Sequence, residues 1–309
     1  MRRLRRKSRC TFPAFPYDGG GWVSAVETGR TIFRRPCVNK SMASLFGAAL
    51  LGLALSSPAF EVSDLLQQKV QQELDILRRE GPKMGDTMFM MREAGGAYLP
   101  EIVEAANADK YQSMEKRRIM VGIYWMDLTY ASTFHQAEPA AKYGQAICQL
   151  LDSLGYPWPD MERRYREALE QIDQPGGEDE IWDLFREQSE SIEWQEMLKD
   201  GEGLELVVNG LYGYLLEGLY LATEIAVQSN YEPNYMRFVG DTKNAFQAFD
   251  RLLALFTDEP ELAALVRQQE RAQFTTVLLN IIGSMPEVGE DQVNAIRAFT
   301  RKYRNDVMK

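Results

Sequence analysis

The stretch "GIYWMDLTY", Gly122–Tyr130, places a lone carboxylate, Asp127, among apolar and aromatic residues. A second stretch, "LYGYLLEGLYLATEI" at Leu211–Ile225, does the same with Glu217 and Glu224. Apolar residues surround these carboxylates on all sides of a helix, and neither stretch alternates as a strand would. A helix that is apolar all round is buried, so we expect the helices of Asp127 and Glu217 to cross at the centre of the fold, where Gly122, Gly213 and Gly218 permit close approach.

The rest of the chain from residue 60 keeps the same helical spacing. About 250 residues remain there, enough for one sizeable core. The sequence predicts an all-α fold, a single-domain irregular helical bundle or array of about nine or ten helices over residues 60–309. Within it, "VGIYWMDLTYASTFHQ" and the following "AEPAAKYGQAICQLLDSLG", residues 121–155, are expected to form a helical hairpin. The expected breaks hold Pro or Gly beside polar residues, and they fall at "EGPKMGD", "YLPE", "LGYPWPD", "DQPGGEDE", "LKDGEG", "NYEPN", "TDEPE" and "SMPEVGED".

The N-terminal part has the layout of an export signal. An uncharged run of eleven residues, Leu45–Leu55, is too short to span a bilayer, which takes about 20 apolar residues. The small residues "SSPA" follow it, so residues 42–59 are predicted to be a signal peptide. Residues 1–41 are predicted to be a basic extension, non-native or disordered, with a true start at Val38 or Met42. The alternative is a real extension with the apolar run as an uncleaved anchor.

The charge of the chain excludes one class of partner. Residues 1–40 hold ten Lys/Arg and two Asp/Glu, so the remainder, with 25 Lys/Arg and 43 Asp/Glu, carries near −18. Such a charge repels phosphate backbones, and we expect no nucleic-acid partner. The basic run "RAFTRKYRND", Arg297–Asp306, is interpreted as a last helical turn whose cations suit the helix dipole.

Cysteine usage agrees with a soluble product. Cys148 is the only cysteine after residue 59, so no internal disulfide is expected there, and we assign it to core packing. We predict a periplasmic or secreted protein with no transmembrane helix in its mature form.

The two carboxylate stretches supply the candidate ligand-binding residues. On a helix, Asp127 shares a face with Tyr124 and Tyr130. In the second stretch one stripe holds Gly210, Gly213, Glu217, Tyr220 and Glu224, and the glycines would let another backbone approach closely. The full set of candidates is Asp127, Glu217, Tyr124, Tyr130, Tyr214, Tyr220, Glu224 and His135.

A buried carboxylate costs several kcal/mol unless it is paired or hydrogen-bonded. Three arrangements meet that need. Asp127 could accept hydrogen bonds from tyrosine hydroxyls or helix amides, or it could pair with a cation such as Arg92 or Arg118. In the third arrangement the carboxylates converge on a ligand, a metal or a reacting proton.

Motifs for metal or nucleophilic chemistry are missing from the sequence. Carboxylate-bridged di-iron bundles use Glu-x-x-His pairs, whereas the only histidine here, His135, has no Glu three residues before it. One Cys and one His after residue 59 do not make a zinc site. There is no Gly-x-Ser-x-Gly elbow and no phosphate-binding loop. We therefore expect no metal and no cofactor, and we interpret His135 as a turn residue that ends a helix.

The quoted stretches resemble a family of exported all-helical bacterial proteins, many of them lipoproteins, that have no assigned activity. The shared pattern is Gly-x-Tyr-x-x-Asp-Leu-x-Tyr at Gly122–Tyr130, followed by Glu-Gly-Leu-Tyr-x-Ala-Thr at Glu217–Thr223. The resemblance covers roughly residues 94–255, and this sequence lacks the anchoring cysteine of the lipoproteins. It implies export and a helical fold, and it implies no reaction.

Two functions follow from these patterns. The first is a non-enzymatic envelope module that binds a partner protein or a small ligand. The alternative is an enzyme or small-ligand site, in which Asp127 or Glu217 acts as general base beside tyrosine hydroxyls. The two differ in whether the carboxylates border an open cavity or are sealed by side chains.

Overall fold

The computed structural model describes residues 61–93, 96–190, 197–283 and 288–309. The predicted basic extension and signal peptide, residues 1–59, lie outside the described residues. Within the described ranges the protein is all-α, as predicted, without a β-strand. No helix in these ranges is both long and apolar enough to cross a membrane.

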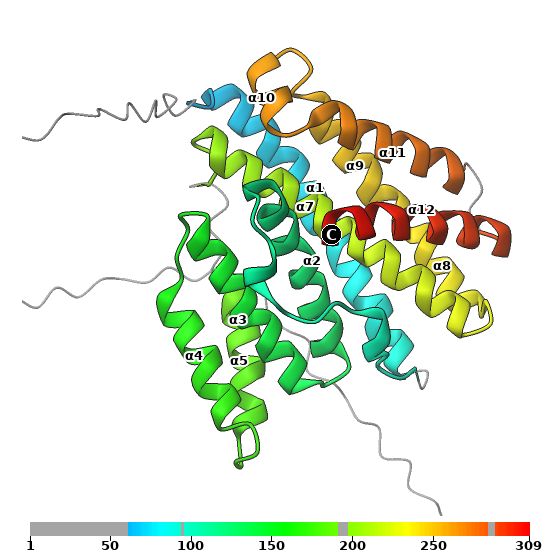
Figure 1. Ribbon diagram of the computed structural model, residues 1–309. Coiled ribbons are helices and arrows are strands. Elements are labelled where there is room, and N and C mark those ends of the chain that lie inside the picture. Colours follow the sequence, from blue (N-terminus) through cyan, green and yellow to red (C-terminus); the bar gives the residue numbers. More distant parts are fainter. Residues whose placement is uncertain (1–60, 94–95, 191–196, 284–287) are drawn as a thin grey trace, which may run out of the picture. The chain divides into compact units, whose positions relative to one another are not determined.

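The helices follow one another along the chain with short connections (Figure 1). Two 3-10 turns, η1 (Pro100–Ile102) and η2 (Ala108–Lys110), lie in the segment between the first two α-helices. The α-helices are α1 (Asp64–Glu93), α2 (Met114–Thr133), α3 (Ala137–Ser153), α4 (Pro159–Glu170), α5 (Gly177–Glu190), α7 (Gly201–Gln228), α8 (Pro233–Asp241), α9 (Lys243–Ala254), α10 (Pro260–Leu265), α11 (Gln268–Ile282) and α12 (Glu290–Met308).

The central pair is α2 and α7, the two carboxylate helices. A Cβ added to Gly122 would lie 1.8 Å from the Gly210 carbonyl oxygen, and one added to Gly213 would lie 2.1 Å from the Ile119 carbonyl oxygen. Glycine is needed on both helices because their backbones touch directly at these positions. Arg118 near the start of α2 pairs with Glu205 of α7, and Asp127 farther along α2 lies beside Glu217, so the two helices run parallel.

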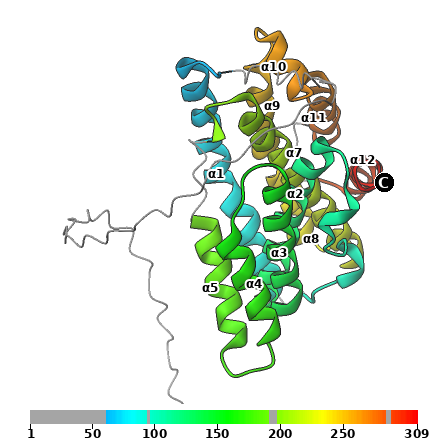
Figure 2. The same ribbon diagram turned by 60° about the vertical axis from the view of Figure 1, so that its left-hand side comes forward.

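Other helices pack around this pair (Figure 1). On one side, α3 packs on α2, α4 packs on α3, and α5 packs on α4; Figure 2 shows these three helices side by side. Helix α12 packs along α7, and α8 packs against the end of α7. Helix α1 packs on α9, which in turn packs on α11. The packing thus brings α2, α7 and α12 together from three distant parts of the chain.

The predicted hairpin of α2 and α3 is confirmed. Ser113 caps α2, since its side chain accepts a hydrogen bond from the Lys116 backbone N–H at 3.2 Å. After Thr133 the chain turns at His135, whose φ of +54° is left-handed, and α3 begins at Ala137. His135 is therefore the turn residue that the sequence indicates.

One expected break is wrong. The stretch "EGPKMGD" at residues 80–86 does not interrupt α1, which continues from Asp64 to Glu93. Buried residues on both sides of it, Leu77 and Met88, anchor the helix, and α1 packs on α9 and α2. This packing overrides the weak helix propensity of Pro and Gly, which is only a local preference. At the other predicted breaks the chain leaves the helix.

Candidate functional site

Asp127 on α2 and Glu217 on α7 meet in the interior. Asp127 is five residues beyond Gly122 and Glu217 is four residues beyond Gly213, and both side chains are 0% exposed. Because the two helices run parallel, nearly equal steps along them keep the residues level. The two carboxyl groups lie within hydrogen-bonding reach of each other. The structure therefore brings together the two carboxylates that the sequence singled out.

Glu217 is held by Arg304 of α12. Arg304 Nε donates to Glu217 Oε2 at 2.6 Å, and Nη2 donates to Oε1 at 2.9 Å. The guanidinium also lies 4.2 Å from the centre of the Tyr220 ring, a cation–π contact. Burial raises the pKa of Glu217, and the positive charge of Arg304 opposes that shift. The paired, bidentate geometry stabilises Glu217 as a carboxylate.

Asp127 has no such cation. Neither of its carboxyl oxygens has a hydrogen-bond donor among the described residues. The expected partners are occupied elsewhere, since Arg118 pairs with Glu205 at 2.6 Å and Arg92 donates to the Thr133 carbonyl at 2.8 Å. Burial, and next the negative charge of Glu217, raise the pKa of Asp127 well above its ordinary value.

The chemistry of the pair follows from this difference. A buried carboxyl group without a cation keeps its proton, because the neutral form is the less costly one to bury. The protonated Asp127 is then the hydrogen-bond donor, and the ionised Glu217 is the acceptor. We assign one proton, one negative charge and the positive charge of Arg304 to this cluster, which is neutral as a whole.

The tyrosine hydroxyls of α2 do not form hydrogen bonds with Asp127. The Tyr124 hydroxyl accepts a hydrogen bond from the Asn107 backbone N–H at 3.0 Å, and the Tyr130 hydroxyl accepts one from the Leu99 N–H at 3.1 Å. Both hydroxyls thus fix the segment between α1 and α2 on the surface of α2. A tyrosine side chain is long enough to carry its hydroxyl past the neighbouring carboxylate, which residue spacing alone does not reveal.

Two further groups near Asp127 were missed in the sequence. Burial raises the pKa of the Tyr98 and Tyr143 phenols, and Asp127 in its ionised form would raise both further. The Tyr143 hydroxyl donates to the Glu104 carbonyl at 2.7 Å. Tyr143 lies in the predicted hairpin on α3, so its helical position could be predicted, but Tyr98 lies in an irregular segment with no periodicity to place it.

On α7, Tyr214 and Tyr220 lie in different surroundings. Tyr214 is half-buried, and burial raises its pKa to about 12. Tyr220 is 7% exposed, and its ring covers the Arg304 guanidinium. Its hydroxyl makes no hydrogen bond within the described part of the chain. The Tyr220 O–H is therefore free to donate to a ligand.

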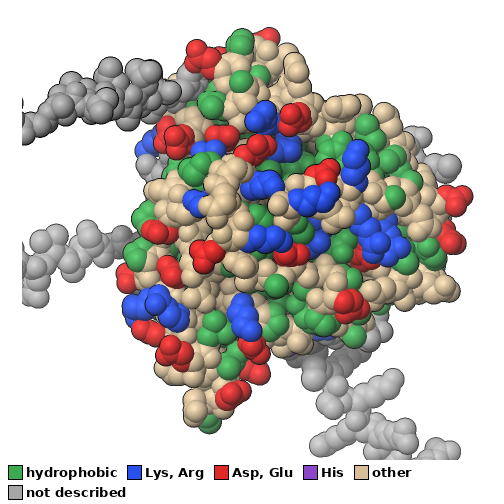
Figure 3. Space-filling view, in the orientation of Figure 1, with side chains coloured by type: hydrophobic (Ala, Val, Ile, Leu, Met, Phe, Trp, Pro, Cys, Tyr) green, Lys and Arg blue, Asp and Glu red, His purple; other side chains and the backbone are tan. Residues whose placement is uncertain are grey.

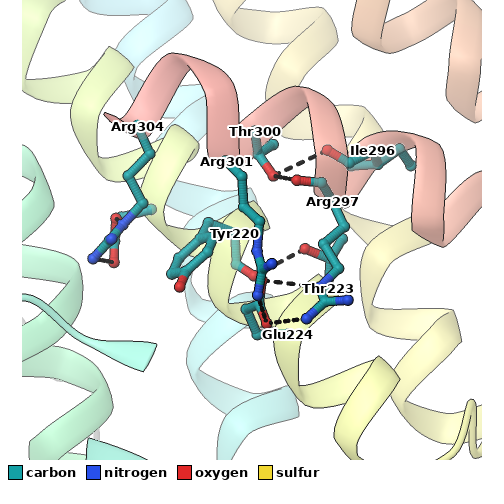
Figure 4. A network of polar contacts seen from close by, with 9 residues as sticks. Tyr220, Thr223, Glu224, Ile296, Arg297, Thr300, Arg301 and Arg304 are labelled. Atoms are coloured by element: carbon teal, nitrogen blue, oxygen red, sulfur yellow. Dashed lines mark hydrogen bonds and ion pairs between the residues drawn. The ribbon is translucent and has the colours of Figure 1, made fainter. Parts of the chain in front are cut away.

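Glu224 lies seven residues after Glu217 on the same stripe of α7, and α12 supplies its partners (Figure 4). Arg297 Nε and Nη2 donate to it at 3.0 and 2.8 Å, and Arg301 Nε and Nη2 donate at 2.5 and 2.7 Å. Burial acts to raise the pKa of Glu224, but the two guanidinium groups outweigh it and lower that pKa below its ordinary value.

These contacts correct the interpretation of the basic run as a helix end. Arg297 and Arg304 are seven residues apart on α12, as Glu217 and Glu224 are on α7. Seven residues are close to two helical turns, so both pairs face each other when the helices run antiparallel. The matching spacing was the signal in the sequence that could have identified the arginines as partners.

His135 takes no part in the carboxylate cluster. Its Nε2 lies 2.6 Å from Arg92 Nη1, and its ring lies 5.6 Å from that of Trp182 in an edge-on contact. Within the residues that the structure describes, no three or more His, Cys, Asp or Glu side chains are grouped to hold a metal ion. Comparisons with protein-family models, with curated proteins and with solved structures gave no match for this chain.

Proposed function

We propose that the protein is an exported, non-enzymatic helical module that binds a partner protein or a small ligand. In this proposal Asp127, Glu217 and Arg304 form a structural lock between α2, α7 and α12, and the binding surface lies outside it. The proposed family is the group of exported all-helical bacterial proteins that the sequence resembles.

The complete burial of Asp127 and Glu217 is the observation that supports the proposal best. A general base must come within hydrogen-bonding reach of the substrate proton, directly or through one water. Both carboxyl groups are 0% exposed, and Arg304 already occupies both oxygens of Glu217. Side chains that are sealed in this way fix the packing of helices, which is what buried polar networks mostly do.

The enzyme alternative draws on one observation, the unpartnered carboxyl group of Asp127 with its raised pKa. Such groups are common in active sites. The alternative also requires a route from the surface to Asp127, whose side chain is 0% exposed. We therefore favour the structural role.

Asp127→Asn tests the role of the pair. A thermal-shift panel of amino acids, sugars, small carboxylic acids and peptides would be run on the wild type and on this variant. If the pair is a lock, each compound that stabilises the wild type stabilises the variant by the same shift. A variant that melts like the wild type but loses one compound's shift would instead place the ligand at Asp127.

Export is tested on native material. Cell fractions would be probed for the protein, and its N-terminus would be sequenced. A mature chain that begins near Phe60 in the periplasm or the medium supports export. A cytoplasmic product that retains Met42 contradicts it.

A further inference from the structure

Arg297 and Arg301 each keep one edge of the guanidinium group unused. Both bind Glu224 through Nε and Nη2, and neither makes another hydrogen bond or ion pair within the described part of the chain. The Arg297 side chain is 25% exposed and that of Arg301 is 47% exposed, whereas Glu224 is 1% exposed. The Nη1 donors of both arginines are therefore available at the surface.

The charges at this place do not balance. Arg297 and Arg301 share one carboxylate, that of Glu224, so one positive charge remains beside it. The surplus lies at Arg301, because Arg304 is buried against Glu217 and Glu224 accepts from two cations at once. Lys and Arg side chains also gather over α12 on the face seen in Figure 3, in a chain whose formal net charge is −10.

Tyr220 adds a neutral donor at the same place. Figure 4 shows its ring between Arg304 and Arg301, and the charges of both arginines act on its phenol group. The side chain is 7% exposed, and its hydroxyl has no hydrogen-bond partner among the described residues. The hydroxyl is not among the buried polar atoms that lack a partner, so it reaches solvent. It can therefore add a neutral donor to the unused guanidinium edges.

We propose that Arg297, Arg301 and Tyr220 form a binding site for the carboxylate group of a small organic acid. Planar guanidinium edges match the geometry of a carboxylate, and one negative charge cancels the single surplus positive charge. Arg297 and Arg301 are one turn apart on α12, and Tyr220 lies on α7, against which α12 packs, so the site suits one anionic group. The acidic chain repels extended polyanions. This inference rests on the proposed function, because it names the ligand class of the binding module.

A nuclear magnetic resonance titration of the arginine Nε–Hε signals tests the site. Sodium acetate would replace sodium chloride at constant ionic strength in a sample of the folded protein. We expect the signals of Arg297 and Arg301 to shift along a saturating curve. Phosphate, run as a second titrant, should bind no more tightly than acetate if the site is matched to a single negative charge.

Variants separate this site from general charge screening. Arg301→Gln should remove saturable binding and still fold, because Glu224 keeps Arg297. Tyr220→Phe should weaken binding several-fold, because it removes only the hydroxyl. The matched control is Arg251→Gln on α9, since Arg251 is 50% exposed and pairs with one carboxylate, Glu73, at 3.1 Å; this change should leave binding unaltered.

Three outcomes would overturn the inference. Linear shifts of equal size at Arg251 and Arg301 would mean screening alone, and unaltered binding in Arg301→Gln would mean that the anion binds elsewhere. Tighter binding of phosphate would exclude a carboxylate site. None of these outcomes removes the proposed function, which fails if the thermal-shift panel places ligand binding at Asp127 or if the protein is not exported.

Discussion

Arg304 and Glu217 join α12 to α7 through two parallel hydrogen bonds, at 2.6 and 2.9 Å, deep inside the protein. Seven residues later on α7 and seven residues earlier on α12, Glu224 and Arg297 repeat the contact. The two pairs set the register of α12 against α7. Asp127 then connects the same cluster to α2, so three helices from distant parts of the sequence depend on one polar centre.

Arg304→Met should destabilise the protein by about 3–5 kcal/mol, because it leaves Glu217 buried without its cation. The methionine retains the apolar length of the side chain, so the loss measures the charge and its hydrogen bonds. Urea unfolding followed by circular dichroism gives the free energy of unfolding for the variant and the wild type.

Arg301→Gln is the control for that change. Arg301 is 47% exposed, and Arg297 remains on Glu224, so we expect a loss of about 0–1 kcal/mol. The double variant Arg304→Met with Glu217→Leu should recover most of the stability lost in the single variant, because it removes the unpaired charge. Equal losses in Arg301→Gln and Arg304→Met would contradict the central role of the buried pair.

The sequence was a good guide to the helices and a poorer one to their partners. Apolar periodicity and Pro/Gly punctuation predict the all-α fold and the α2–α3 hairpin, because these signals are local. The break expected around Pro82 is wrong for the opposite reason, since the packing of α1 is decided by residues far away in the sequence. Local propensity alone does not contain that information.

For the site, spacing predicted the meeting of Asp127 and Glu217 because glycine marks close helix contacts. The glycines at 122 and 213 do lie at that contact. The arginine partners were not predicted, since Arg304 is 87 residues from Glu217 in the sequence. The hydroxyls of Tyr124 and Tyr130 were assigned to the carboxylates, but they reach the backbone of an irregular segment that has no sequence period.

Gly122→Ala should be strongly destabilising, and Gly210→Ala should be tolerated. The new Cβ at residue 122 would lie 1.8 Å from a backbone oxygen, so α2 and α7 must separate, whereas at residue 210 the nearest atom is 3.8 Å away. Overpacking costs about 1–3 kcal/mol or more, while alanine in place of a helical glycine contributes up to about 1 kcal/mol. Denaturation midpoints of the two variants check this, and a tolerated Gly122→Ala would argue against direct backbone contact.

The stability of the protein should fall as the pH rises above about 4 on account of Asp127. Burial and Glu217 hold its pKa above the ordinary value of 3.8, so the folded protein keeps a proton that the unfolded chain releases. This contribution is complete below pH 3.8 and is lost as the pH rises through the folded-state pKa. Glu224 acts in the opposite sense, because its lowered pKa contributes stability above pH 4.5 that is lost in acid.

Unfolding free energies measured from about pH 2 to 9 separate the two effects. Asp127→Asn removes the group that loses its proton, so its unfolding free energy should change less with pH above pH 4 than that of the wild type. Glu224→Gln should instead flatten the acid side of the profile. Identical slopes for the wild type and Asp127→Asn would show that Asp127 does not titrate differently in the folded and unfolded states.

Asp127→Leu tests whether the carboxyl group is structural. In the protonation state assigned above, the Asp127 carboxyl group donates a hydrogen bond to Glu217. Leucine has about the same shape but no donor, so we expect the free energy of unfolding to fall by about 1–3 kcal/mol. The sequence suggested that unpaired donors around Asp127 would cause this loss, whereas in the structure the group left unpaired is the acceptor, Glu217. Asp127→Asn is the matched control, because its amide N–H can take the place of the carboxyl O–H, and its unfolding free energy near pH 5 should stay close to that of the wild type. If Asp127→Leu is as stable as the wild type or more so, the carboxyl group has no role in packing, and a buried group kept at a cost to stability then favours a functional site at Asp127.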